Sequence, residues 1–116
     1  MLFRSNDTVT TAIGDYGGSL KDLPPTELAA RVVKEALSRA KVDPKDVGQC
    51  VFGNVIHTEP KDMYLSRVAC VNGGLPHETG ALTLNRLCGS GMQEIGRASC
   101  RERCTMTCRS RWSPYH

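Results

Sequence analysis

The residue best suited to covalent chemistry in this chain is Cys88, in the stretch N-R-L-C-G-S-G-M-Q at residues 85–93. Residues 81–87 precede the cysteine without any Gly or Pro and carry three leucines, a pattern typical of a buried strand. Gly89 and Gly91 follow the cysteine, and glycine lets a backbone turn sharply without a Cβ clash. The order strand, cysteine, glycine, helix is therefore the thiol counterpart of a nucleophile elbow.

Ser90 is expected to cap the helix that follows by accepting a hydrogen bond from its unpaired amides. The thiol of Cys88 would then lie near the positive end of a helix dipole, which favours the thiolate. The thiolate is the nucleophile that acyl transfer to sulfur requires. The alternative is that Cys88 is a small apolar core residue, which is the commonest role of a lone cysteine.

Charge separates the body of the chain from its ends. The 116 residues suit one small domain, and the formal charge is +3. Residues 6–94 contain nine Lys and Arg against eleven Asp and Glu, so the body is mildly acidic. This distribution argues against nucleic acid as a partner of the body. A basic nucleic-acid-binding peptide over residues 97–112 remains an alternative only if that tail is genuine.

Both ends resemble translated sequencing adapter. Residues 1–5, M-L-F-R-S, match a reading of the end of a common short-read adapter, and residues 95–103 and 108–116 match the opposite adapter. We therefore expect residues 1–5 and 95–116 to be non-native and residues 6–94 to be a partial domain. An intact genomic copy of the gene that encodes either tail would refute this hypothesis.

The cysteines divide along the same boundary. A set at i, i+4 and i+8 with a distant histidine could suggest a metal or cluster site, but it lies wholly in the adapter-like tail: Cys100, Cys104, Cys108 and His116. The three cysteines left are few, odd in number and widely spaced, which favours reduced thiols in the cytosol and no metal: Cys50, Cys70 and Cys88. No apolar run approaches the length of a membrane span.

Periodicity predicts alternating helices and strands. An apolar stripe at helical spacing follows the prolines at 24 and 25 and continues to residue 40, residues 50–56 favour a buried strand, and residues 63–72 favour a short helix. Gly73 and Gly74 would end that helix as a C-terminal cap. Cys50 and Cys70 are expected to be core thiols. The order implies βαβ crossovers, an α/β fold and a mixed, mainly parallel sheet.

Four motifs resemble the thiolases, the family of acetyl-CoA acetyltransferases and 3-ketoacyl-CoA thiolases. They are A-I-G-D-Y-G-G-S-L-K-D-L-P-P-T-E-L, V-F-G-N-V-I, N-G-G-L-P-H-E-T and N-R-L-C-G-S-G-M-Q, spread in family order over residues 11–93. The resemblance implies an incomplete thiolase-like N-terminal half that ends just after the nucleophile motif. The apolar first strand of the family is largely missing, because residues 6–10 read N-D-T-V-T instead.

The resemblance implies that Cys88 takes an acyl group from an acyl-CoA or 3-ketoacyl-CoA and passes it to CoA or to an acetyl-CoA carbanion. The backbone N–H of Cys88 would then donate to the thioester oxyanion. Coenzyme A thioesters would be substrates, with no metal or prosthetic group. The complete enzyme would be a cytoplasmic homodimer or homotetramer.

The activating histidine and the second catalytic cysteine of the family would lie beyond this chain. His57 and His77 match neither motif and are interpreted as polar loop residues. The 116-residue chain is therefore expected not to turn over. The alternative from another functional class is a non-enzymatic binding or redox-sensing module that uses Cys88.

Overall fold

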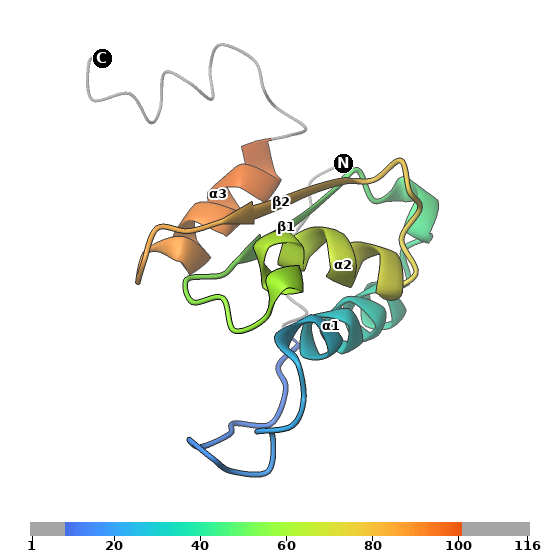
Figure 1. Ribbon diagram of the computed structural model, residues 1–116. Helices are drawn as coiled ribbons and strands as arrows, with labels where there is room; N and C mark the ends of the chain where they lie inside the picture. The colour runs from blue at the N-terminus through green and yellow to red at the C-terminus, as the bar shows by residue number, and fades with distance from the viewer. Residues whose placement is uncertain (1–8, 101–116) are drawn as a thin grey trace, which may run out of the picture.

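The computed structural model describes residues 9–100, with only the backbone of Ser99 and Cys100. The expectations for residues 1–5 and 101–116 therefore lie outside the described residues, and no strand occurs in the described residues before position 25. Figure 1 shows the chain from the N-terminal loop to the last helix. The elements are α1 (Pro25–Ala40), β1 (Gln49–Gly53), α2 (Leu65–Asn72), β2 (Gly80–Leu84) and α3 (Ser90–Cys100).

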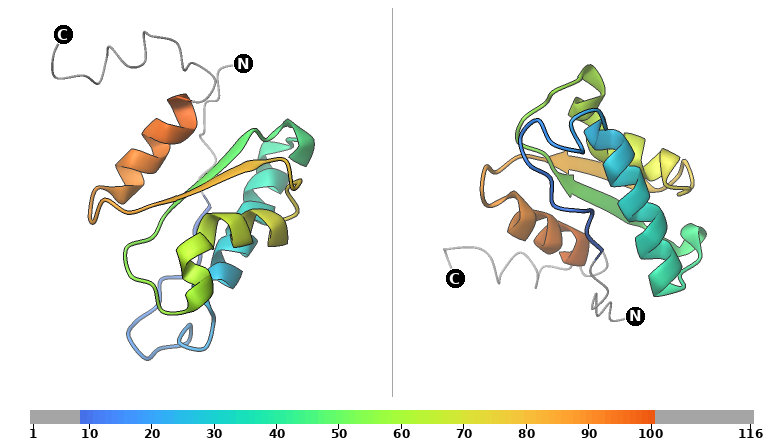
Figure 2. Two further views of the ribbon diagram at one scale, coloured as in Figure 1. Left: turned by 45° about the horizontal axis from the view of Figure 1, so that its top comes forward. Right: turned by 90° about the horizontal axis from the view of Figure 1, so that it is seen from below.

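The centre of the fold is a parallel pair of strands joined through α2. β1 pairs with β2 in a register that runs from Gln49 opposite Gly80 to Gly53 opposite Leu84. The predicted βαβ crossover and α/β class are confirmed, with two strands in the sheet of the described part of the chain. α2 packs against both strands, α1 packs on α2, and α3 packs against β1 from the other side (Figures 1 and 2).

α1 begins and ends where the sequence predicts. Pro24 is extended and precedes the helix, and Pro25 occupies the first turn, where its missing N–H costs nothing. The inward face buries small side chains, while the i,i+4 pairs of Glu27 with Arg31 and Glu35 with Arg39 lie on the exposed face. Exposed pairs of this kind contribute only about 0.3–0.5 kcal/mol each. Burial of the apolar face therefore holds α1 in place.

α2 approaches α1 closely because a glycine ends it. A Cβ on Gly73 would stand 2.5 Å from Cγ1 of Val33, so no larger residue fits this contact. Gly74, with φ +93°, is left-handed and completes the predicted cap. The core lies in this layer between the helices and the sheet, and its buried members are Ala29, Val33, Cys50, Leu65, Ala69, Cys70 and Leu75.

The start of α2 differs slightly from the predicted helix over residues 63–72. A 3₁₀ turn over Pro60–Tyr64 comes first, and the α-helix begins at Leu65. Asp62 organises this turn, because one oxygen of its carboxylate accepts hydrogen bonds from the backbone of Thr58 and Glu59. The hydroxyl of Thr58 donates to the same oxygen, and this bond, with the two backbone bonds, holds the pKa of Asp62 below its ordinary value. No helix in residues 9–100 is both long enough and apolar enough to cross a membrane.

Both predicted strands end earlier than expected. β1 ends at Gly53 rather than residue 56, and β2 ends at Leu84 rather than residue 87. The N–H of Asn54 makes the last bond across the pair, to the carbonyl of Leu84 at 2.9 Å. After this bond, the N–H of Leu87 donates to the side chain of Asn85, so this N–H cannot bond to β1 and extend the pairing of the strands. Most strand residues are half-buried rather than buried, because helices cover the small sheet only in part.

Candidate active site at the carboxyl end of the sheet

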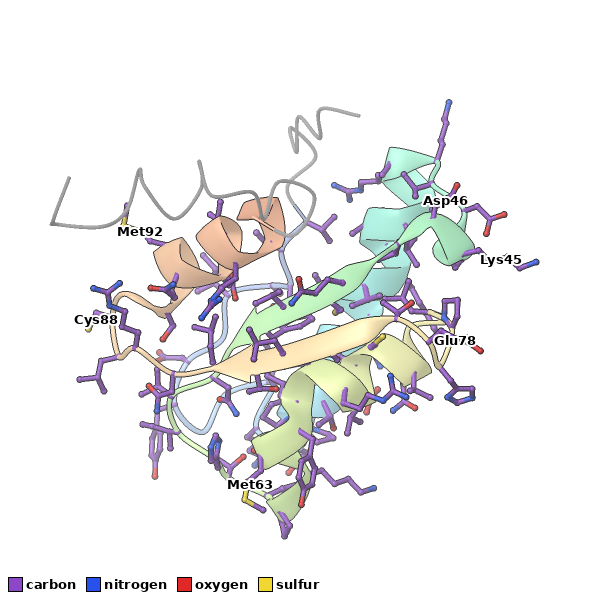
Figure 3. The ribbon with its side chains drawn as sticks, turned by 90° about the horizontal axis from the view of Figure 1, so that it is seen from above. Lys45, Asp46, Met63, Glu78, Cys88 and Met92 are labelled. Atoms are coloured by element: carbon purple, nitrogen blue, oxygen red, sulfur yellow. The ribbon has the colours of Figure 1, made fainter. Side chains whose placement is uncertain are left out.

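Cys88 lies in the turn that joins β2 to α3. β2 ends at Leu84, α3 begins at Ser90, and the side chain of Cys88 is exposed between them. Figure 3 shows it at the tip of the turn, beyond the end of the sheet. This position is the strand-to-helix turn that the sequence predicts, and it differs from a core thiol. The geometry therefore favours a reactive role for this sulfur.

The turn gets its sharp bend from Leu87 rather than from a glycine. Leu87 has φ +47°, in the left-handed region, whereas neither Gly89 nor Gly91 is left-handed. A Cβ on Gly91 would meet nothing within 4 Å, and one on Gly89 would make only an ordinary contact. The expectation that these glycines supply the turn is therefore wrong. Side-chain hydrogen bonds to the backbone of Leu87 hold the bend instead.

Ser90 also differs from its predicted role. Its buried Oγ does not accept from the free amides of α3; it accepts from the N–H of Arg86 at 2.9 Å and donates to the carbonyl of Leu87 at 2.7 Å. The backbone N–H of Ser90 also donates to that carbonyl, at 3.1 Å. Ser90 thus links the helix start to the turn and fixes the residues on either side of the bend.

Several N–H groups around the sulfur have no acceptor inside the described chain. The first helical bond of α3 runs from the N–H of Gln93 to the carbonyl of Gly89, at 3.1 Å. The N–H groups of Cys88, Gly91 and Met92 make no hydrogen bond within residues 9–100. Free amides at a helix start are suited to bind an anion or a developing oxyanion. The turn can therefore offer both a nucleophile and donors for the charge that its attack creates.

The other two described cysteines are unsuited to attack. Cys50 on β1 and Cys70 on α2 are buried and free of disulfides, so the prediction of core thiols is confirmed. Burial raises the pKa of Cys50 to about 11 and raises the pKa of Cys70 as well. Both sulfurs therefore remain thiols at neutral pH, when only a thiolate attacks efficiently.

Neither described histidine contacts Cys88. His57 is exposed in the loop after β1, where its Nδ1 lies 2.9 Å from Nδ2 of Asn54. His77 is exposed in the connector before β2, and its carbonyl accepts a hydrogen bond from Arg67. The prediction of polar loop residues is confirmed for both. Residues 9–100 therefore contain no histidine hydrogen-bonded to the sulfur.

An open pocket lies at the other end of the sheet. Its volume is about 440 Å³, and it opens where β1 and β2 begin. Figure 3 places Lys45 and Glu78 at that end and Cys88 at the opposite one. Ligands of open parallel sheets bind outside the carboxyl ends of the strands, which favours the turn of Cys88 as the site. The cavity is lined by Lys45, Val47, Gly48, Pro76, Glu78 and Thr79.

A metal centre has no candidate among the described residues. Over positions 9–100, no three His, Cys, Asp or Glu side chains gather in a way that could hold a metal ion. The sequence suggested a metal or cluster site made of Cys100, Cys104, Cys108 and His116. The last three lie outside the described residues, and the side chain of Cys100 is not described.

The sequence profile described as thiolase, N-terminal domain, matches residues 7–104. The chain belongs to the thiolase family. Cupriavidus necator has a β-ketothiolase, BktB, that is 67% identical over 87 residues, which cover 75% of this chain and 22% of BktB. The human mitochondrial 3-ketoacyl-CoA thiolase is 46% identical over 94 residues, covering 81% of this chain and 23% of the enzyme. This thiolase chain thus spans about a quarter of its relatives' length.

Solved structures agree with this assignment. The human mitochondrial 3-ketoacyl-CoA thiolase in complex with CoA superposes with a TM-score of 0.73 at 45% identity, over 81% of this chain and 24% of the enzyme. The acetyl-CoA acetyltransferase of Bacillus anthracis gives a TM-score of 0.69 at 36% identity, over 74% of this chain and 22% of that one. The thiolase-like α/β fold predicted from the motifs is confirmed.

Two residues of the turn were missed by sequence reasoning. Asn85 and Leu87 carry the bend, yet they were interpreted only as part of a strand and its flank. A signal for the bend was present, because an Asn side chain often hydrogen-bonds the backbone two residues further along the chain. That spacing is the one from Asn85 to Leu87.

Proposed function

We propose that this chain is the nucleophile-bearing part of a thiolase that moves acyl groups between coenzyme A thioesters. The observation that carries the proposal is the exposed thiol of Cys88 at a strand-to-helix turn, beside N–H groups that have no internal acceptor. The relatives support it, since their names describe a β-ketothiolase and 3-ketoacyl-CoA thiolases. One related structure is described as a complex with CoA.

The first step forms an acyl enzyme. The Cys88 thiolate attacks the thioester carbonyl of an acyl-CoA, and the carbonyl electrons move onto its oxygen. The N–H of Cys88, with that of Gly91 or Met92, is proposed to stabilise this oxyanion, since these groups have no acceptor in the described residues. Collapse of the intermediate breaks the carbon–sulfur bond to CoA and releases CoA thiolate, which takes up a proton. With a 3-ketoacyl-CoA the thiolate attacks the 3-keto carbonyl instead, the bond between C2 and C3 breaks as the intermediate collapses, and acetyl-CoA leaves as a carbanion that must be protonated.

The second step removes the acyl group from Cys88. CoA thiolate attacks the acyl-Cys88 thioester in the direction of cleavage, and an acetyl-CoA carbanion attacks it in the direction of condensation. Each attack restores the Cys88 thiolate. The base that deprotonates Cys88 and the group that moves the α-proton are proposed to come from outside residues 9–100, because neither described histidine bonds the sulfur.

The proposed function also implies substrates, an oligomeric state and a cellular location. We propose that acyl-CoA and CoA are its substrates, that it needs no metal or prosthetic group, and that the complete enzyme is a homodimer or homotetramer. A cytoplasmic location is supported by two buried cysteines that form no disulfide, Cys50 and Cys70. A redox-sensing module is not favoured, since the relatives are named as acyl-transferring enzymes.

The test is acylation of the purified chain by acetyl-CoA, followed by mass spectrometry of its peptides. We expect one acetyl group per chain, on Cys88, and release of CoA that stops once every chain is acylated. The Cys88→Ser variant is the matched control, because an alcohol at this position has little nucleophilic anion at neutral pH. Acetyl groups spread evenly over the cysteines, or absent from Cys88, would contradict the proposal.

A further inference from the structure

The backbone of Leu87 adopts a conformation that a leucine does not choose by itself. Its φ of +47° lies in the left-handed region, which an L-residue with a Cβ occupies at a cost. The side chain gains little there, because 69% of Leu87 is exposed. Other groups must therefore hold this residue in place, and it directly precedes the nucleophile.

The carboxamide of Asn85 lies where it can hold Leu87 in its left-handed conformation. Its Oδ1 accepts the N–H of Leu87 at 3.0 Å, and its Nδ2 donates to the carbonyl of Val55 at 3.3 Å. Val55 follows the end of β1 and Leu87 follows the end of β2, so one side chain joins the two loops at the carboxyl edge of the sheet. The bond to Val55 anchors the amide, and the bond to Leu87 fixes the bend.

The other side of Leu87 is fixed by Ser90. The carbonyl of Leu87 accepts hydrogen bonds from Oγ and from the N–H of Ser90, and Ser90 is buried. A trans peptide directs its N–H opposite to its C=O. The N–H in the same peptide belongs to Cys88, so it points away from the buried serine and stays free of internal acceptors. The orientation of Leu87 thus sets the orientation of the Cys88 amide.

We propose that Asn85 is a positioning residue for the nucleophile: it holds Leu87 left-handed and thereby presents the thiol and N–H of Cys88 together. The inference deepens the proposed acyl transfer and rests on it. Asn85 touches no reacting atom and acts only through Leu87. Replacing it would therefore change how often the turn is in its reactive form.

The experiment compares variants of the 116-residue chain by two rates at Cys88, acetylation by acetyl-CoA and alkylation by iodoacetamide, both measured by peptide mass spectrometry. Asn85→Ala is expected to slow both reactions about tenfold, because the left-handed conformation of Leu87 loses its support. Asn85→Asp keeps an acceptor for the N–H of Leu87 but loses the donor to Val55, so its rates should lie between those of the parent and those of Asn85→Ala. Asn72→Ala removes an exposed asparagine that makes no side-chain hydrogen bond in the described chain and serves as the matched control.

The decisive variant is Asn85→Ala combined with Leu87→Gly. Glycine adopts positive φ without strain, so the double variant should return both rates to within about twofold of the parent, the range of a near-neutral change. A merely structural asparagine would not be rescued in this way. Unchanged rates in Asn85→Ala, no rescue by Leu87→Gly, or equal losses in Asn85→Asp and Asn85→Ala would each overturn the proposal.

Folding and function can be separated in the same experiment. Circular dichroism of each variant shows whether the chain keeps its structure, and Asn85→Asp still tests the bond if Asn85→Ala unfolds. If the parent is alkylated but never acetylated, acyl transfer fails as the proposed function. The alkylation rates then still decide whether Asn85 positions Cys88.

Discussion

The three cysteines whose side chains the structure describes carry the same thiol in different surroundings. Cys88 is exposed at the turn, whereas Cys50 and Cys70 are buried in the layer between the sheet and α2. Desolvation disfavours a thiolate, so burial raises the pKa of both core cysteines. Reactivity in this chain is therefore decided by position rather than by residue type.

Among Cys50, Cys70 and Cys88, iodoacetamide should consequently label Cys88 first. In the native chain at neutral pH we expect Cys88 to be modified completely while Cys50 and Cys70 stay unmodified, and all three to react once urea unfolds the chain. Peptide mass spectrometry of timed samples measures this order. Equal labelling of Cys50 and Cys88 before unfolding would show that the core is open.

Stability should fall at alkaline pH because of Cys50. Its pKa rises from 9.0 to about 11 on folding, so the unfolded chain ionises first. The stabilising contribution is therefore complete below pH 9 and is lost as pH rises toward and through 11, by about 3 kcal/mol in total. Urea unfolding at several pH values measures it. Cys50→Ala should flatten the decline, and an unchanged slope in this variant would count against Cys50 as its source.

At the scale of elements, the contact of α3 with β1 fixes where the turn lies. A Cβ on Gly53 would stand 2.8 Å from Cβ of Ser90, so this strand end must be a glycine for the helix start to fit. The N–H of Gly53 also donates to Oε2 of Glu94, at 2.5 Å. The end of β1 and the first turns of α3 are thus joined directly beneath the Cys88 turn.

Gly53→Ala should therefore disturb the site from a distance. The added methyl group pushes α3 from β1, with an expected loss of about 1–3 kcal/mol in free energy of unfolding, typical of overpacking. Gly91→Ala is the matched control, because its Cβ meets nothing within 4 Å and alanine favours a helix. Urea unfolding and the alkylation rate of Cys88 measure both effects. Equal stability of the two variants would argue against the close contact.

The whole molecule leaves much apolar surface uncovered. Its described part has one parallel pair of strands, while parallel sheets are normally covered on both faces. Large exposed side chains occur on the N-terminal loop, between β1 and α2, on the Cys88 turn and on α3: Ile13, Tyr16, Ile56, Met63, Tyr64, Leu87, Met92 and Ile95. The matched residues make up only 22% and 23% of two relatives, and we propose that the further residues of a complete enzyme cover such surfaces.

The isolated chain is accordingly expected not to turn over. With acetoacetyl-CoA and CoA it should consume no more substrate than its Cys88→Ala variant after the first acylation, since the described part of the chain places no histidine on the sulfur. Following substrate absorbance at catalytic chain concentration tests this. Sustained CoA-dependent cleavage by the parent alone would show that the chain carries its own base.

The origin of the two ends of the chain also concerns the whole molecule. We propose that residues 1–5 and 95–116 derive from adapter, because their letters match translated adapter sequence. Sequencing the source gene with adapters removed tests this. The expected result is a different continuation after Glu94.

The sequence by itself determined the family, the order of elements and the identity of the nucleophile candidate. Helical and strand periods depend on neighbours along the chain, so α1, α2 and the strand cores follow from composition and spacing. The buried state of Cys50 and Cys70 followed for the same reason.

Only the tertiary structure decided how the turn is anchored to the rest of the fold. The bend falls on Leu87 because the side chain of Asn85 accepts a hydrogen bond from its N–H and donates one to Val55 in the loop after β1. The buried hydroxyl of Ser90 also donates a hydrogen bond to the carbonyl of Leu87. One of these bonds spans the 30 residues from Val55 to Asn85, and Gly53 meets α3 from a still more distant part of the chain. Local patterns cannot encode such contacts, since they arise when parallel strands place their ends side by side.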